Sequence, residues 1–414
     1  MLQQMLEKLG IGRSLSALAI AIGALGSWPL QAQISRKGVW DIHDAFILGS
    51  KPLQNNDDPA LVVKSGTQQV FTGKSGKKVL GWDNGPKDGS VILWWSGGPG
   101  VGFAPGPSED RFSASAINYR QVCIDTPGCG NVSEWVPNWR PEDSVEDAVT
   151  FLKLRGIKGP VIVSGWSWGS TMSLLFAQRH PELVKGVVVG GVWANTAAEV
   201  KRYIGPKGTK TLTPGTNQVF APIFGKGNDP AGRLHRAIRD GKGGSDLVSA
   251  YGMSEGFQGL TDVDMREPFS ASAWKKYEQY ATPESNDMAK QFAFIESEMM
   301  WRGERGKWKL RLEFPRSLAN TPLIVIQGRY DQICDPAIAI KAYDAWPGSN
   351  KLLILMNANH GGYLWVNEDS LKRAGAPHDP ESLLRAQRAM RLHLGDPQTM
   401  NLAGIEFIAR NQNH

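Results

Sequence analysis

The sequence predicts an α/β protein with a mostly parallel central sheet, and three observations support this fold class. Short apolar runs with the length of buried strands alternate with segments of helical periodicity. Several of these runs end directly in turns rich in glycine or polar residues. Between 194 and 316 helical periodicities dominate and no clear buried strand is visible, which predicts a helical lid inserted into the sheet protein.

The first predicted strands are 91–95 and 121–124. The first of them ends in the glycine-rich turn 96–100, and the second ends in the turn-rich segment 125–130. Continuous apolar runs like these are typical of parallel strands that are covered on both faces. Further strands are predicted at 161–164, 184–192, 323–326 and 352–356.

Helices are predicted between these strands. Apolar residues recur at helical spacing over 144–154, where Ser144 opens the helix and Asp147, three residues later, completes a capping-box-like pair. A second helix is predicted over 170–178 and ends before Pro181. The alternation of strands and helices therefore predicts a parallel sheet covered on both faces.

Residues 1–32 have the features of a secretory signal peptide. Lys8 and Arg13 precede an apolar stretch over about 15–30, which is shorter than the roughly 20 residues that a membrane span needs. An uncleaved anchor or an amphipathic N-terminal helix is the alternative interpretation. We expect a periplasmic or secreted protein with no stable membrane span after signal removal. Its remaining chain is expected to divide into a first core segment (33–193), the lid (194–316) and a second core segment (317–414).

Composition narrows the possible functions. The net charge is +6 with no long basic block, so the charge pattern gives no support for nucleic-acid binding. Three cysteines cannot all pair within one chain, and none has metal-ligand spacing with a histidine. Cys123 lies in an apolar run and is expected to be a buried thiol. We therefore expect neither a metal nor another cofactor, and the sequence leaves the oligomeric state open.

Residues 165–169 read GWSWG, which places Ser167 in a G-x-S-x-G frame between a predicted strand and a predicted helix. This is the layout of a nucleophile elbow, in which the glycines allow a very tight turn. The main-chain amide of Trp168, at the start of the helix, is then expected to face an oxyanion formed on an acyl group. A glycine-rich turn without chemistry is the alternative.

An acid and a histidine follow two later strands. Asp331 comes after the strand 323–326, and His360 comes after the strand 352–356. Functional residues of open parallel sheets gather at the carboxyl ends of the strands. The order Ser167, Asp331, His360 is that of an α/β-hydrolase triad, with serine as nucleophile, histidine as general base and aspartate as its orienting partner.

Two other residues complete the predicted site. The loop after the strand 91–95 contains Gly98, whose amide is expected to supply the second oxyanion donor. In the predicted lid, Glu296 lies beside apolar residues at helical spacing, and a carboxylate in that place needs a partner. From the residues alone, a solvent-facing glutamate or an internal ion pair is the favoured interpretation.

The motifs resemble those of the prolyl iminopeptidase family, serine aminopeptidases of the α/β-hydrolase fold, over most of 80–365. The family pattern HGGPG is similar to 96–100 (SGGPG), and DQRGCGRS is similar to 125–133 (DTPGCGNVS) with one added residue. GGSWGS is similar to 165–170 (GWSWGS), and GRYD is matched at 328–331. The resemblance implies an α/β hydrolase with an inserted helical lid.

In the predicted lid, 273–278 (AWKKYE) is similar to the family stretch AWSxWE, and 294–296 (FIE) is similar to RIE. The family glutamate of the latter stretch helps to hold the free α-ammonium of the substrate, which implies that role for Glu296. By the same resemblance Trp274 and Glu278 are expected to contact substrate.

Several positions depart from the family pattern. Ser96 replaces the motif histidine, Thr126 and Pro127 replace Gln-Arg, and Glu298 stands where the family often has histidine. None of these positions belongs to the triad, whereas Ser96 bears on the first substrate subsite. Tryptophans near the motifs, namely Trp94, Trp95, Trp166, Trp168 and Trp274, are candidates to line a pocket for a small apolar side chain, although most tryptophans only pack.

The sequence thus predicts a serine aminopeptidase that releases N-terminal proline or another small residue from short peptides through an acyl-enzyme. An esterase or amidase of the same fold, acting on a small acyl substrate, is the second hypothesis. A non-catalytic binding protein with a hydrolase fold is the third, and it would be favoured by loss of a triad member.

Overall fold

The computed structural model describes residues 39–42, 67–85, 87–100, 119–129, 133, 135–205, 229–241, 283–329, 331–356 and 360. The predicted signal peptide, Trp274 and Glu278 lie outside the described residues. The strands are β1 (Val39–Ile42), β2 (Thr67–Thr72), β3 (Lys78–Asn84), β4 (Ser90–Trp95), β5 (Tyr119–Ile124), β6 (Val161–Trp166), β7 (Val184–Gly190), β8 (Leu323–Gly328) and β9 (Lys351–Met356).

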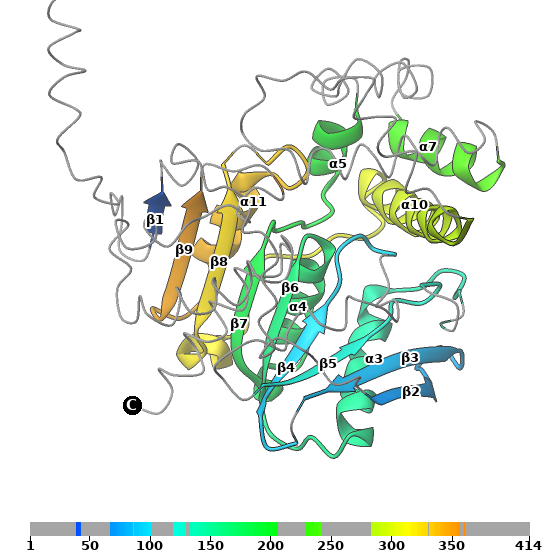
Figure 1. Cartoon of the computed structure of the whole chain (residues 1–414). Helices are drawn as coiled ribbons and strands as arrows, with labels where there is room; N and C mark the ends of the chain where they lie inside the picture. Colours follow the sequence, from blue (N-terminus) through cyan, green and yellow to red (C-terminus); the bar gives the residue numbers. More distant parts are fainter. Residues whose placement is uncertain are drawn as a thin grey trace, which may run out of the picture.

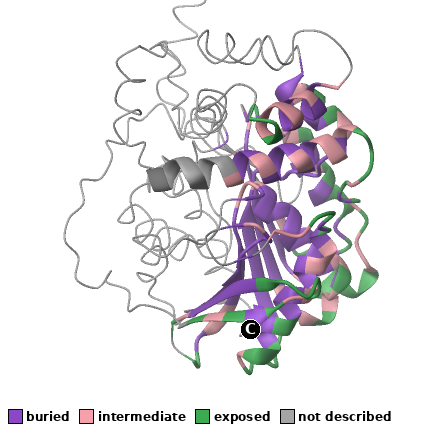
Figure 2. Cartoon of the chain, turned by 90° about the vertical axis from the view of Figure 1, so that its right-hand side faces the viewer, coloured by how far each residue is buried: buried purple, intermediate pink, exposed green. Residues whose placement is uncertain are grey.

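Within the described residues, nine strands form one sheet in the order β1-β9-β8-β7-β6-β4-β5-β3-β2 (Figure 1). The pairs β2–β3 and β3–β5 are antiparallel, and the other pairs are parallel. The central strands are buried on both faces, as Figure 2 shows, which explains why their sequences are continuous apolar runs. The predicted α/β class with a mostly parallel sheet is therefore confirmed.

Strand boundaries differ from the sequence-based prediction where a glycine changes the backbone. The strand predicted over 184–192 ends at Gly190, because Gly191 adopts a positive φ of 52° that extended backbone does not allow. The strands β1 to β3 were missed. The sequence of β2 (TQQVFT) is mostly polar and contains no apolar run that would indicate a strand. It forms a strand at the edge of the sheet, where it pairs antiparallel with β3.

Helices α3 (Pro141–Leu154), α4 (Trp168–Arg179) and α11 (Pro336–Ala345) accompany the sheet, together with the short 3-10 helices η3 (Pro181–Leu183) and η5 (Arg316–Asn320). The predicted start of α3 was wrong. The helix begins with Pro141, a residue suited to the first helical position, and the Ser144 hydroxyl bonds the indole nitrogen of Trp139 at 2.9 Å. Asp147 is buried and accepts the main-chain N–H of Lys74 instead of closing a capping box.

The described part of residues 194–316 contains α5 (Ala197–Ile204), α7 (Pro230–Arg239) and α10 (Pro283–Glu304). Helix α10 contacts both α5 and α7. In Figure 1 the strands β7, β8 and β9 point with their carboxyl ends toward the side of the sheet on which these helices lie. We refer to α5, α7 and α10 as the inserted helices; the division of the chain at 194 and 316 stays a prediction.

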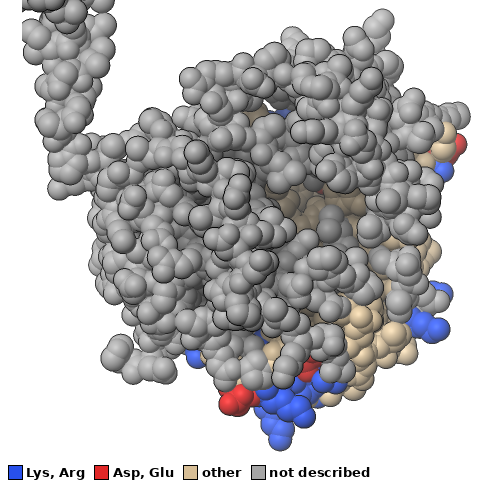
Figure 3. All heavy atoms as spheres, viewed as in Figure 1, with Lys and Arg blue, Asp and Glu red and all other residues tan. Residues whose placement is uncertain are grey.

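Charged side chains are distributed unevenly on the face shown in Figure 3. The described Lys and Arg residues gather mainly at the lower edge, at the end of the sheet opposite to the inserted helices. Described Asp and Glu side chains lie beside them, so this edge carries charges of both signs. Among the described helices, none combines the length and the apolar character that crossing a bilayer requires.

Candidate active site

The turn between β6 and α4 has the geometry of a nucleophile elbow. Ser167 adopts φ 55° and ψ −121°, a backbone conformation that is unusual for a residue with a side chain. A Cβ on Gly165 would lie 2.3 Å from the carbonyl oxygen of Gly169, and a Cβ on Gly169 would lie 2.2 Å from that of Trp95. Both glycines are thus needed for the close approach of β4, β6 and α4 that presents Ser167.

Asp331 is fully buried just past the carboxyl end of β8. Its Oδ1 accepts the main-chain N–H groups of Ile333 at 2.9 Å and Cys334 at 2.8 Å, and its Oδ2 accepts Nε2 of Gln327 at 3.0 Å. The same Oδ2 lies 2.8 Å from Nδ1 of His360. A carboxylate held in this way orients the imidazole with Nδ1 protonated, which leaves Nε2 as a base.

Cys334 lies close to both the predicted nucleophile and the predicted base. Its Sγ is 3.9 Å from the Ser167 Oγ, and the potential ligand atoms of Cys334, Asp331 and His360 all lie within 4.8 Å of one another. The spacing of cysteine and histidine in the sequence did not indicate this proximity. Because Asp331 and His360 already bond each other, we interpret the group as the triad with an adjacent thiol. The structure thus brings Ser167, Asp331 and His360 to one place.

The predicted oxyanion donors lie on either side of the elbow. Trp168 is the first residue of α4, where main-chain N–H groups have no acceptor within the helix. Gly98 lines a pocket together with Ser167, and its φ of 102° is accessible mainly to glycine. A Cβ on Gly97 would lie 3.7 Å from the Ser167 Cβ, so this glycine loop rests against the elbow. Their roles as donors stay predictions.

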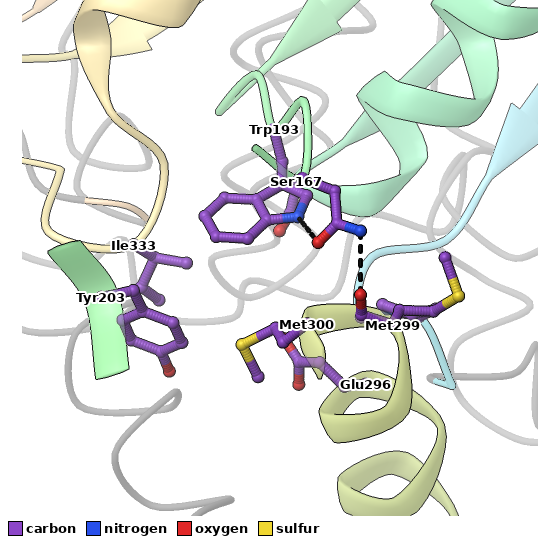
Figure 4. A pocket seen from close by; sticks show the side chains of 10 residues that line it. Ser167, Trp193, Tyr203, Glu296, Met299, Met300 and Ile333 are labelled. Atoms are coloured by element: carbon purple, nitrogen blue, oxygen red, sulfur yellow. Dashed lines mark hydrogen bonds between the residues drawn. The ribbon is translucent and has the colours of Figure 1, made fainter. Parts of the chain in front are cut away.

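Ser167 lines a pocket between the sheet and the inserted helices (Figure 4). Glu296, from α10, lines the same pocket and is only 6% exposed. The interpretation of Glu296 as a solvent-facing residue is therefore wrong, because the apolar face of α10 is turned inward and carries the glutamate with it. The remaining walls are mostly apolar and include Trp193, Tyr203, Met299, Met300 and Ile333.

The tryptophans divide into core and site residues. Trp94, Trp95 and Trp168 are buried, and none of them lines the pocket among the described residues. The Trp166 ring packs edge-on against His360, with 6.2 Å between the ring centroids. Trp193 does line the pocket and was missed, although it follows the carboxyl end of β7, the same signal that identified Asp331 and His360.

Two further sequence observations are resolved by the structure. Glu298, which departs from the family pattern, forms an ion pair with Arg302 on the same helix. Cys123, Cys129 and Cys334 are all buried, and no disulfide joins any two of them. The prediction of a buried Cys123 thiol is confirmed, and burial raises its pKa well above the ordinary value.

The chain was compared with models of protein families and with solved structures. The family model of the alpha/beta hydrolase fold matches residues 89–207, which contain β4, the elbow and β7. Among solved structures, the chain is similar to an alpha/beta hydrolase enzyme from a Medee basin deep-sea metagenome library. The identity is 16%, the match covers 75% of this chain and 98% of that chain, and the TM-score is 0.48. By sequence and topology the protein is an α/β hydrolase.

Curated relatives narrow the class further. The chain is 30% identical to a proline iminopeptidase of Neisseria gonorrhoeae over 61% of this chain and 77% of the relative. It is 27% identical to a proline iminopeptidase of Arabidopsis thaliana over 68% of this chain and 72% of the relative. The chain belongs to the proline iminopeptidase family and is a serine hydrolase, so the resemblance seen in its motifs is confirmed.

Proposed function

We propose that this protein is an aminopeptidase that releases N-terminal proline, or another small residue, through an acyl-enzyme on Ser167. The observation that carries the proposal is that Ser167 and the buried carboxylate of Glu296 line one small pocket. A carboxylate out of water binds an ammonium group through charge-assisted hydrogen bonds, whereas a neutral acyl group gains nothing from it. The pairing of a nucleophile with such a carboxylate favours substrates that have a free N-terminus.

The proposed reaction gives each residue of the triad one role. His360, oriented by its 2.8 Å contact with Asp331, takes the proton of Ser167 through Nε2 as the serine oxygen attacks the carbonyl carbon. The N–H groups of Gly98 and Trp168 stabilise the resulting oxyanion. His360 then protonates the leaving amine, the C–N bond breaks, and the acyl-enzyme is hydrolysed by water activated at the same Nε2.

The walls of the pocket support an apolar first residue such as proline. Apolar walls that include Met299, Met300 and Ile333 favour an apolar first side chain over a charged one. Binding of the substrate ammonium by Glu296 places the first carbonyl near Ser167, so cleavage follows the first residue. Proline, whose secondary amine is also charged at neutral pH, fits both requirements.

The test is hydrolysis of proline-naphthylamide by the purified protein and by Ser167→Ala. The substitution removes the nucleophile, and kcat is expected to fall on the order of 10⁴- to 10⁶-fold. Circular dichroism and thermal unfolding check that the variant is folded. Full activity in Ser167→Ala would contradict the proposed mechanism.

An esterase or amidase with a broader pocket is the competing function, because the same triad cleaves simple acyl groups. A panel of aminoacyl naphthylamides beside p-nitrophenyl esters separates the two functions. An aminopeptidase prefers the free-amine compounds, and an esterase prefers the neutral esters. A protein inert toward both panels would support the non-catalytic alternative.

We also propose that the protein is exported, on the basis of residues 1–32, in which basic residues precede a short apolar stretch. The N-terminus of protein purified from its native cells is expected to begin close to residue 33. An intact Met1 would contradict cleavage of a signal peptide.

A further inference from the structure

We propose that Asn195 is a positioning residue that sets the separation between Ser167 and Glu296, and thereby restricts cleavage to the bond after the first residue. The inference rests on the proposed function, because that separation matters only if Glu296 binds the substrate ammonium. Asn195 is not part of the predicted triad, oxyanion site or ammonium site. It is fully buried and lines the pocket between them.

The backbone of Asn195 is held in a conformation that few residues adopt. Its φ is 56°, in the left-handed region that asparagine tolerates better than most other residues with side chains. The buried carboxylate of Glu199 holds both neighbouring peptides, since it accepts Ala194 N–H at 3.0 Å and Thr196 N–H at 2.9 Å. The loop therefore fixes the backbone from which the Asn195 side chain extends.

The Asn195 side chain bridges the end of β7 and α10. Its Nδ2 donates to the carbonyl oxygen of Met299 at 2.9 Å, and its Oδ1 accepts Nε1–H of Trp193 at 3.3 Å (Figure 4). The same Nδ2 also donates to the carbonyl oxygen of Trp308 at 3.3 Å. A Cβ on Gly303 would lie 2.5 Å from the Asn195 carbonyl oxygen. A glycine at this place lets α10 approach the loop closely enough for these bonds.

These contacts connect the two functional side chains by a short path. At one end, the N–H of Ser167 donates to the carbonyl of Gly190, the last residue of β7 and five residues before Asn195. At the other end, Met299 lies one helical turn after Glu296 on α10. Asn195 thus holds the turn that carries the carboxylate against the strand that holds the elbow. Loss of the bridge lets that turn move while each side chain stays intact.

The docking of α10 does not depend on Asn195 alone. Arg302, on the same helix, donates to the carbonyl of Trp139 and pairs with Glu298. The main-chain N–H of Leu310 also donates to the carbonyl of Ala194 at 2.9 Å. A variant without the Asn195 amide is therefore expected to fold with α10 in place. It should lose only the accurate separation between Ser167 and Glu296.

The experiment uses two matched substrates, proline p-nitrophenyl ester and cyclopentanecarboxylic acid p-nitrophenyl ester. They share ring size and leaving group and differ in the ammonium. Asn195→Gly keeps the left-handed backbone and removes the bridge. Asn195→Asp keeps the shape of the side chain and the acceptor for Trp193, but it replaces the donor to the Met299 carbonyl with an acceptor. Because there are two variants, the experiment remains informative if one of them is unstable.

In both variants kcat/KM for the proline ester is expected to fall on the order of 10- to 100-fold, as misplacement by about 1 Å does, and the cyclopentane ester is expected to stay within about threefold. In a Glu296→Gln background the Asn195 substitution should add little further loss of preference, because the two residues act through one contact. Melting temperatures accompany each measurement.

Gln178→Ala is the matched control. Gln178 also uses a carboxamide to hold the chain after α10, donating to the carbonyls of Arg311 and Glu313, but it is on the exposed side of α4. Its loss should leave the substrate preference unchanged. An unchanged preference in the Asn195 variants, or an equal loss on both esters, would overturn the inference. If Glu296→Gln shows the same preference between the two esters as the wild type, the proposed function is contradicted. The inference about Asn195, which rests on it, is then contradicted as well.

Discussion

The carboxyl edge of the sheet and the inserted helices contribute different things to one pocket. The sheet carries the three residues of the proposed triad, namely Ser167 after β6, Asp331 after β8 and His360 after β9. Helices α5 and α10 supply Tyr203 and Glu296, which contact the substrate in the proposed function. Reactive groups on rigid strand ends keep their geometry, whereas recognition depends on how well separate helices are docked over them.

The sheet region tolerates almost no added volume at the elbow, and the first prediction tests this. Gly169→Ala would place a Cβ 2.2 Å from the carbonyl oxygen of Trp95 and 3.0 Å from that of Ser96. Because both atoms belong to the backbone, we expect a loss of about 3 kcal/mol or more in the free energy of unfolding, together with loss of activity.

Urea unfolding measures this effect. Gly159→Ala is the control, since no atom lies within 4 Å of a Cβ at that position, and its effect is expected to stay within about 0.5 kcal/mol. Equal stability of the two variants would show that the elbow is less constrained than its geometry indicates.

The helical region is expected to respond to substitution through substrate preference. Glu296→Gln keeps the shape of the side chain and removes its charge. We expect kcat/KM for proline p-nitrophenyl ester to fall about 10- to 100-fold, because one charge-assisted hydrogen bond is lost. The kcat/KM for the cyclopentane ester should change little. Glu298→Gln, on the same helix but paired with Arg302, is the control. Similar losses on both esters would argue against an ammonium site.

Acid is expected to loosen the inserted helices. His235 on α7 stacks on Trp301 at 5.5 Å, and its Nδ1 lies 3.1 Å from the Ser297 Oγ. Burial, followed by the charges of the arginines at 239, 236 and 302, lowers the pKa of His235 to about 4. A lowered histidine pKa means that the unfolded chain binds the proton better, so stability falls as the pH decreases from about 6.5 to about 4.

His235→Phe keeps an aromatic ring in place and removes the titration. Relative to pH 7, the wild type is expected to lose about 2 kcal/mol by pH 4.5 that the variant retains. Urea unfolding followed by tryptophan fluorescence at both pH values gives the comparison. Parallel losses in the two proteins would exclude His235 as the cause.

The sheet region contains a group with the opposite pH dependence. Burial raises the pKa of Asp147 on α3 to about 6, so the folded protein binds this proton better than the unfolded chain. Its contribution to stability is therefore fully present below about pH 4 and is lost as the pH rises through 6.

Asp147→Asn keeps an acceptor for the Lys74 N–H and removes the charge. At pH 8 the variant is expected to be more stable than wild type by about 1 kcal/mol, with the difference shrinking toward pH 4. Urea unfolding at both pH values measures it. A difference that stays constant with pH would mean that Asp147 does not titrate in this range.

The sequence-based predictions were correct where the local sequence is sufficient to specify the structure. The runs that became β4, β5, β6, β8 and β9 are continuous and apolar because they are buried on both faces, and the glycines at 165 and 169 are demanded by one turn. The placement of Asp331 and His360 followed from a general property of parallel sheets. The prediction failed at β1 to β3 and at the start of α3, where distant partners determine the pairing or satisfy the cap.

By itself, the sequence determined the fold class, the family and the three candidate triad residues, because each depends on local patterns or on their order along the chain. Only the tertiary structure decided that Glu296 enters the pocket of Ser167, that Trp193 and Tyr203 line it, and that Asn195 links the strand to the helix. Two of these relations, between Ser167 and Glu296 and between Asn195 and Met299, join residues more than a hundred positions apart. They depend on which face of α10 is turned inward and how closely it packs, and no local pattern of side chains specifies that distance.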